Sequence, residues 1–179
     1  MPNWCSNTLK VYTTDEDSKE SMVKFQKKLG LAKDKYSVDK LLSKFIPLPE
    51  ELKDVYSGGC TIDGKSHTRW LQIDGKNVAI PQKVLDGWWK KYGAHCWYDW
   101  CCNEWGTKWD TDGYCNVDDE EYIELDFDTA WCPPMEWFNK VVKKYPTLHF
   151  TLKYEEEGCG FLGLAKGTDG QVDDQCIEY

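Results

Sequence analysis

The chain has 179 residues, and its 22 lysines and arginines against 31 aspartates and glutamates give a formal net charge of −9 at neutral pH. A general nucleic-acid binder carries a basic surface, so this balance argues against binding to long nucleic acid. It is compatible with a partner that is itself basic, such as a nucleic-acid-binding protein. No apolar stretch has the length needed to span a membrane, so we expect no membrane partner.

The counts of cysteine and tryptophan, nine and ten, are both high. The start, from Met1 to Asn7, has no basic region followed by an apolar core, so we expect no secretory signal and a cytoplasmic location with reduced thiols. The length fits one domain, residues 1–179, with room for an insertion. So many large aromatic rings imply an aromatic core, a stacking surface, or both.

The first third of the chain predicts a strand followed by two helices. Alternating apolar residues indicate a half-buried strand over residues 8–13. Apolar residues at helical spacing indicate a helix over residues 17–29, closed by Gly30. A second, short helix is expected over residues 38–45, because its apolar residues lie on one face, and the prolines that follow end it.

The composition changes between Gly58 and Ile80. The run Ile62–Lys65 is echoed by Ile73–Lys76, and each contains an Asp-Gly pair, which favours tight hairpin turns. These residues therefore predict a small antiparallel β-meander, inserted around residues 54–82. A helical stretch follows from Pro81.

The second half contains a run, Tyr122–Asp128, in which apolar and acidic residues alternate strictly. Ile123, Leu125 and Phe127 are expected to face the core, while Glu124, Asp126 and Asp128 face outward. A helix over residues 134–145 and strands over residues 148–154 and 161–165 follow. The order of strands and helices predicts an α+β fold of the split βαβ kind, with a mainly antiparallel sheet and helices on one face.

The segment from Asn103 to Asp110 places two indoles, a cation, a hydroxyl and two carboxylates around one glycine. We expect a helix to end at Trp105 and Gly106 to adopt a left-handed conformation. Two tryptophans and a lysine can sandwich a nucleotide base and contact its phosphate. The candidate ligand-binding residues are Asn103, Trp105, Thr107, Lys108, Trp109 and Asp110. The plainer interpretation is that both rings belong to the core and the polar residues cap the loop.

The outward carboxylates Glu124, Asp126 and Asp128 form a ladder along one strand. The ladder can be a solvated face, or it can chelate Mg²⁺ or Ca²⁺, which prefer oxygen ligands. It can also imitate the negative charge of a phosphate backbone towards a basic partner protein. These three residues are therefore the candidate partner-binding site.

The densest group of potential zinc ligands is His95, Cys96, Cys101, Cys102 and Cys115. Zinc sites normally repeat a closely spaced pair of ligands, and no second pair follows this one. We therefore expect no metal, no cofactor and no obligatory disulfide. No sequence context joins a cysteine to a histidine, and there is no glycine-rich phosphate loop, so no catalytic residues are predicted.

Four short motifs stand out along the chain: Met1–Asn7, Ile46–Leu52, Trp105–Asp110 and Phe127–Pro134. These motifs and their order resemble the YubB-like ferredoxin-fold family of phages, plasmids and other mobile elements. The resemblance implies a ferredoxin-like fold and a mobile-element origin, and it implies no reaction. The inserted meander falls outside it.

The leading hypothesis is a non-enzymatic accessory protein of a phage or mobile element in the cytoplasm of its bacterial host. It would bind a host protein through its acidic surface and thereby inhibit a host defence. The alternative is a nucleotide-binding module, or a small enzyme, that uses the loop Trp105–Asp110.

Overall fold

The computed structural model describes residues 3–30 and 36–179, and the chain forms two compact units. Unit 1 comprises Met1–Ile46 and Trp105–Tyr179, and unit 2 comprises Pro47–Glu104. The insertion expected around residues 54–82 lies inside unit 2, which also includes a short helix before the meander and two helices after it. No helix within the described ranges is long and apolar enough to cross a membrane.

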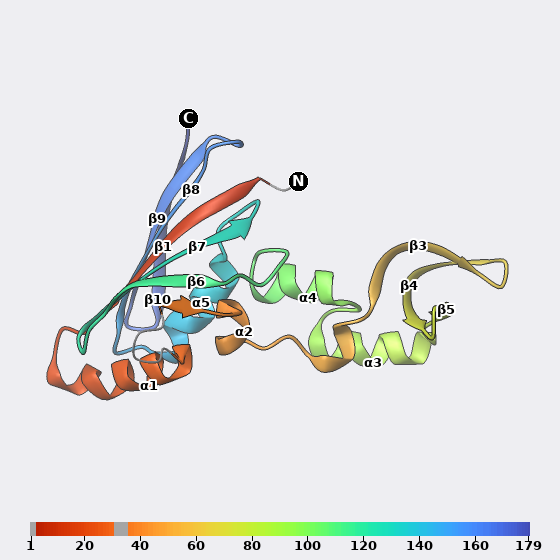
Figure 1. Ribbon diagram of the computed structural model, residues 1–179, viewed down its shortest axis with the longest axis horizontal. Coiled ribbons are helices and arrows are strands. Elements are labelled where there is room, and N and C mark those ends of the chain that lie inside the picture. Colours follow the sequence, from red (N-terminus) through yellow and green to blue (C-terminus); the bar gives the residue numbers. More distant parts are fainter. Residues whose placement is uncertain (1–2, 31–35) are drawn as a thin grey trace. The chain divides into compact units, whose positions relative to one another are not determined.

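Unit 1 is built on a seven-stranded sheet in the order β10-β9-β8-β1-β7-β6-β2, and every pair of neighbours is antiparallel (Figure 1). Its strands are β1 (Trp4–Tyr12), β2 (Ser37–Val38), β6 (Gly113–Asp118), β7 (Tyr122–Ala130), β8 (His149–Glu156), β9 (Phe161–Thr168) and β10 (Gln171–Glu178). Four consecutive strands of this sheet, β8-β1-β7-β6, form the ferredoxin-like core, in which two βαβ crossovers are interleaved.

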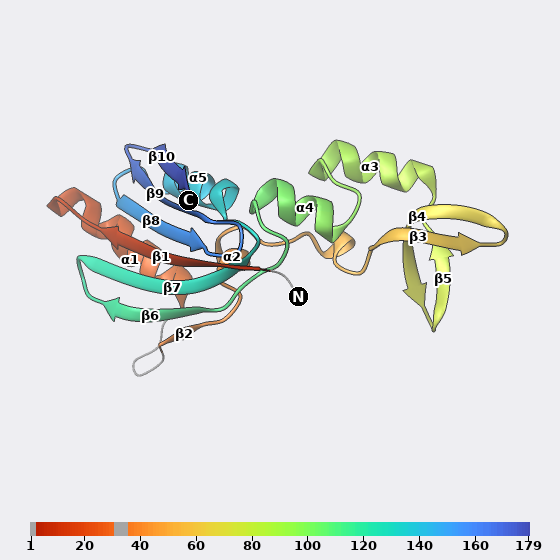
Figure 2. The ribbon, with the colours of Figure 1, turned by 90° about the horizontal axis from the view of Figure 1, so that it is seen from above.

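The helices of unit 1 lie on one face of this sheet (Figures 1 and 2). They are α1 (Lys19–Leu29), α2 (Leu41–Phe45) and α5 (Met135–Lys144), with a 3₁₀ turn, η1 (Glu16–Ser18), before α1. The Asp15 carboxylate accepts the Ser18 N–H at 2.8 Å near the start of α1. At its other end α1 is closed by Gly30, whose φ of +67° suits glycine. The helix predicted over residues 17–29 is therefore confirmed.

The core of unit 1 lies between the sheet and these helices. Ile123, Leu125 and Phe127 are all buried on β7, so the predicted inward face is confirmed. Leu9 and Leu125 are register partners on β1 and β7, and both are fully buried. Burial of these apolar side chains stabilises the sheet-on-helix packing, because it removes apolar area from water.

Unit 2 consists of a short helix, a three-stranded meander and two further helices. Its elements are η2 (Glu50–Leu52), β3 (Tyr56–Ile62), β4 (Lys65–Ile73), β5 (Lys76–Ala79), α3 (Gln82–Tyr92) and α4 (Trp97–Glu104). In both hairpin turns the Asp and the Gly have positive φ, so the predicted Asp-Gly turns are confirmed. Val55, Ile80 and Cys96 form a small buried cluster within this unit.

Candidate functional site

Three of the four motifs seen in the sequence meet in unit 1, where β1 and β7 pair through Trp4 and Ala130. The Asn7 side chain, which is buried, donates to the Cys5 carbonyl oxygen at 2.8 Å and to the Thr129 hydroxyl at 2.9 Å. The Thr129 hydroxyl in turn donates to the Cys132 carbonyl oxygen at 2.8 Å. The first motif begins at Met1, and its first two residues lie outside the described residues.

The loop Trp105–Asp110 joins this network through two further contacts. The Thr107 hydroxyl donates to the Ala130 carbonyl oxygen at 3.0 Å, and the Cys132 thiol donates to the Gly106 carbonyl oxygen at 3.0 Å. A buried polar group is costly unless it is hydrogen-bonded, and here the motifs satisfy one another. These motif residues therefore fasten one end of the sheet.

Gly106 adopts the predicted left-handed conformation, with φ of +80°, just after α4 ends at Glu104. A Cβ at this position would lie 3.1 Å from the Glu136 backbone nitrogen, so the close approach also favours glycine. The helix end and the glycine turn predicted from the sequence are both present.

The structure does not bring the six candidate ligand-binding residues into one open site. Trp105 is buried, and its indole N–H donates to the Ile46 carbonyl oxygen at 2.9 Å. The Asp110 carboxylate accepts the backbone N–H of Leu42 at 2.9 Å and of Thr111 at 2.9 Å, so it anchors the start of α2. Asn103 belongs to unit 2, where its amide donates to the Gly93 carbonyl oxygen at 3.2 Å.

Each of the three motifs nevertheless places one tryptophan at the surface. Trp4 is 54%, Trp109 38% and Trp131 48% exposed. The rings of Trp4 and Trp109 are 6.5 Å apart between centroids, and the Lys108 ammonium lies 4.3 Å from the Trp109 ring centroid. Trp4 and Trp131 were not among the residues predicted for the site. The signal that could have identified them is their position within the motifs that resemble the YubB-like family.

The outward carboxylates of β7 are each matched by a polar side chain of β1 in the register of the sheet. Ser6 donates to Asp128 at 2.9 Å and Thr8 donates to Asp126 at 2.6 Å. At the third rung, Lys10 forms an ion pair of 3.2 Å with Glu124.

Glu124 differs from the two aspartates in the charge of its neighbours. It accepts the Tyr122 hydroxyl at 2.5 Å, and this hydrogen bond, with the Lys10 ammonium, holds the pKa of the Glu124 carboxyl below its usual value. The Lys10 ammonium also offsets the negative charge of the Glu124 carboxylate. Asp126 and Asp128 accept hydrogen bonds from neutral groups, which fix the carboxylates and leave their charge in place.

An open hollow of about 570 Å³ lies beside these two aspartates. Its wall includes Trp4, Asp112, Tyr114, Asp126 and Asp128. Tyr114 on β6 is 55% exposed and stacks on Tyr36, with the ring centroids 6.0 Å apart. The hollow therefore combines carboxylates with partly exposed aromatic rings.

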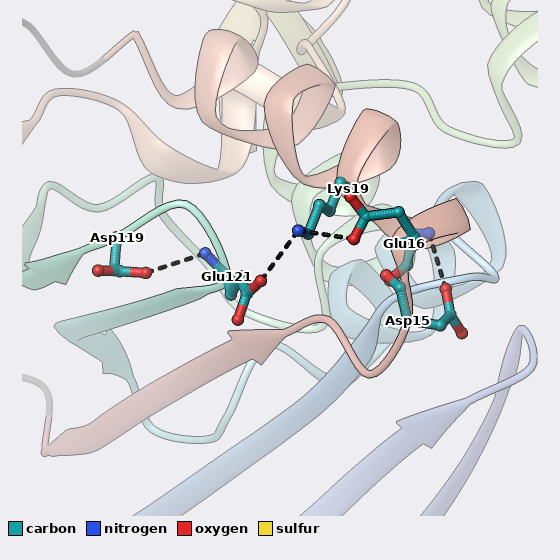
Figure 3. Close-up of polar contacts among 6 residues, drawn as sticks. Asp15, Glu16, Lys19, Asp119 and Glu121 are labelled. Carbon is teal, nitrogen blue, oxygen red and sulfur yellow. Dashed lines mark hydrogen bonds and ion pairs between the residues drawn. The ribbon is translucent and has the colours of Figure 1, made fainter.

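The acidic run that precedes β7 has a different role from the ladder. Glu121 forms an ion pair of 3.2 Å with Lys19, and Lys19 forms a second ion pair of 2.7 Å with Glu16 (Figure 3). The Gln26 side chain donates to Asp118 at 2.9 Å. These contacts join α1 to the turn between β6 and β7, so this run is partly engaged in holding the fold.

The candidate zinc ligands are divided between the two units. Cys96 and Cys101 are buried in unit 2, and Cys115 is buried on β6 of unit 1. Burial raises the pKa of the Cys115 thiol to about 11 and that of Cys5 to about 12. Within residues 3–30 and 36–179, no group of three or more metal-binding side chains is placed to hold an ion. That the purified protein carries no stoichiometric zinc remains a prediction, which elemental analysis tests.

The interleaved βαβ crossovers and antiparallel order place unit 1 in the ferredoxin-like class of α+β folds. Residues 104–179 match the family model described as the ferredoxin-like domain in Api92-like protein. This match agrees with the fold class predicted from the sequence, which is confirmed.

Two individual proteins are similar to this chain. The uncharacterized protein YubB of Escherichia coli strain K12 is 28% identical over 79 residues, which are 43% of this chain and 54% of YubB. The chain thus spans about half the length of this curated relative. The crystal structure of a protein named api92 from Yersinia pseudotuberculosis covers 100% of this chain and 98% of its own at 14% identity, with a TM-score of 0.47. The matches to the family model and to YubB support a relationship to YubB-like proteins.

Proposed function

We propose that this protein is a non-enzymatic binding protein whose open sheet face in unit 1 docks a basic host protein. Its setting is a phage or another mobile element, where it serves as an accessory factor that counters a host defence. The motif resemblance is what supports the choice of setting. The observation that carries the binding role is the distribution of charge in unit 1.

The strand-bearing segments of unit 1 are more acidic than its helical segments. The strand-bearing segments 3–14, 106–134 and 149–179 contain sixteen aspartates and glutamates and four lysines. The helical segments 15–30, 36–46 and 135–148 contain six acidic residues and nine lysines. Unit 2 has eight acidic and seven basic residues, so unit 1 carries almost all of the net charge of −9.

The ladder carboxylates of β7 lie on the accessible side of the sheet of unit 1. The helices of unit 1 occupy the opposite face (Figure 2). Asp126 and Asp128 lie on the accessible face, and both are exposed. Surfaces of opposite charge attract one another over several ångströms, which accelerates association and disfavours acidic partners. A basic protein is therefore the partner that these carboxylates fit.

The test compares the full chain with a variant that lacks the ladder charges, Glu124→Gln with Asp126→Asn and Asp128→Asn. Glu20→Gln with Glu50→Gln and Glu136→Gln is the matched control, because it removes three exposed charges that belong to α1, to unit 2 and to α5 and not to the sheet of unit 1. Each protein is immobilised and offered a nuclease-treated host lysate. A protein retained by the wild type is then purified, and its binding rates to all three proteins are measured.

We expect the ladder variant to lose about tenfold in association rate, and added salt to shrink this difference, because exposed charge is screened. The control variant should bind as the wild type does. Equal association rates for the ladder variant and the control would overturn the proposed function.

The alternative, a nucleotide site in the loop Trp105–Asp110, has less support from the geometry. Trp105 is buried within unit 1. Its ring is therefore not accessible, and a stacked base with its phosphate would depend on Trp109 and Lys108. Lys108→Ala is the cleaner test of this alternative. It should abolish nucleotide binding if the loop is the site, and it should leave the basic partner bound if the sheet face is the site.

A further inference from the structure

The hollow beside β7 is lined by carboxylates and aromatic rings. Asp126 and Asp128 lie along β7, and Tyr114 is the register partner of Asp126 on β6. Trp4 lies on the other side, on β1, and is 54% exposed. Single exposed rings are common on protein surfaces, but rings that line one hollow together with carboxylates can contact a ligand or a partner.

The carboxylates of the hollow are held in place by neutral donors. Asp126 accepts Thr8 on one oxygen and Asn116 on the other, both at 2.6 Å. The Lys40 backbone N–H donates to Asp112 at 2.7 Å, and Ser6 donates to Asp128. These donors fix the carboxylates without neutralising them, so the hollow is ordered and negative before a partner arrives.

Among the cations that proteins carry, the guanidinium of arginine fits this combination best. It is planar, so it stacks on indole and phenol rings, and its fork of N–H donors pairs with carboxylates at two points. A lysine ammonium is a compact, strongly hydrated charge that gains less from a ring face. The volume of about 570 Å³ accommodates such a side chain and its neighbours.

We infer that this hollow takes an arginine side chain from a basic segment of the partner, with Trp4 and Tyr114 contacting the guanidinium and Asp126 and Asp128 pairing with it. This inference rests on the proposed function, because it names the group through which the basic partner is recognised. It adds two aromatic residues to the partner-binding site.

The experiment measures binding of hexa-arginine and hexa-lysine peptides to the full chain by calorimetry at one fixed ionic strength. Trp4→Leu and Tyr114→Leu each remove a ring and keep an apolar side chain. Trp89→Leu is the control, since Trp89 is a 56% exposed tryptophan of unit 2. Circular dichroism and thermal unfolding of each variant establish that it is folded.

We expect the wild type to bind hexa-arginine about tenfold more tightly than hexa-lysine. Trp4→Leu and Tyr114→Leu should each reduce this preference by about fivefold, while Trp89→Leu keeps it. Equal affinity for the two peptides, or an equal effect of Trp4→Leu and Trp89→Leu, would overturn the arginine inference.

The two proposals can fail separately. If the ladder variant loses the captured partner but the wild type shows no preference for arginine, the arginine inference fails and the acidic face stands. If the ladder variant keeps the partner, the proposed function itself fails.

Discussion

Trp131 is a bulky residue in a backbone conformation that usually belongs to glycine. Its φ is +72°, its backbone N–H donates to the Asn3 carbonyl oxygen at 3.0 Å, and its ring is about half-exposed. A left-handed conformation costs a residue with a Cβ about 1–2 kcal/mol. Strain of this kind is retained where the surroundings enforce it, and it is concentrated at functional sites.

Comparing glycine with alanine at this position measures the strain without the contribution of the ring. We expect Trp131→Gly to be more stable than Trp131→Ala by about 1 kcal/mol in chemical denaturation, because only glycine relieves the left-handed backbone. The same pair at Trp4, in the strand β1, is the control. There alanine should be the more stable by roughly 0.5–1 kcal/mol. The same order at both positions would contradict a strained Trp131.

At the residue scale, the sequence predicted the outward direction of the carboxylates that line the hollow, but not the aromatic rings beside them. The alternation in Tyr122–Asp128 was enough to orient Asp126 and Asp128, because a strand has a strict period of two. Trp4 and Asp126 are far apart along the chain, and they line one hollow because β1 pairs with β7. Such long-range register depends on packing across the whole sheet and cannot be deduced from a local pattern.

Among the elements, α2 depends on a residue from a distant loop. Its own N-cap residue, Lys40, has φ of 52° and makes no side-chain capping hydrogen bond. The Asp110 carboxylate replaces that cap by accepting the N–H of Leu42 at 2.9 Å. A negative group at a helix start also interacts favourably with the helix dipole.

Removing this distant cap should destabilise unit 1. We expect Asp110→Ala to lower the free energy of unfolding by about 1–2 kcal/mol. Asp110→Asn keeps a hydrogen-bond acceptor and should lose less than half of that. The measurement is urea denaturation followed by circular dichroism. Equal stability of Asp110→Ala and the wild type would show that the helix does not need this cap.

The strands that the sequence predicted and those that it missed differ in their pattern. β7, β8 and β9 follow clear apolar alternation or sequence runs of β-forming residues, and the structure contains all three. β6 was not predicted, because a register shift between Cys115 and Val117 interrupts its alternation. β2 has only two residues, Ser37–Val38, and such a short strand carries no period. It forms because β6 provides its partner.

On the scale of the whole molecule, unit 2 interrupts unit 1 between two residues that are in contact. The Ile46 carbonyl oxygen accepts the Trp105 indole N–H at 2.9 Å, and both residues belong to unit 1. The two ends of the insertion therefore leave unit 1 at neighbouring positions. Insertions with adjacent ends are tolerated because the host fold can close without them.

Unit 1 should accordingly fold without unit 2. We expect a chain in which Pro47–Glu104 is replaced by about six glycine and serine residues to keep cooperative unfolding. It should also keep its preference for hexa-arginine, since the hollow belongs wholly to unit 1. Calorimetric unfolding and peptide titration are the measurements. A shortened chain without a cooperative transition would show that unit 1 requires the insertion.

The central position of β1 also determines the order in which the chain can fold during its synthesis. β1 is made first, yet its partners β7 and β8 begin at Tyr122 and His149. Until those residues leave the ribosome, β1 has no strand to pair with, and the apolar sides of β1 and α1 remain exposed to water. In the meander β3-β4-β5 each strand pairs only with a strand next to it in the sequence. The meander can therefore form before β1 has its partners. A nascent chain of which the residues up to Glu104 have left the ribosome would therefore display a folded meander behind a segment, β1 to α2, still open to proteases and chaperones.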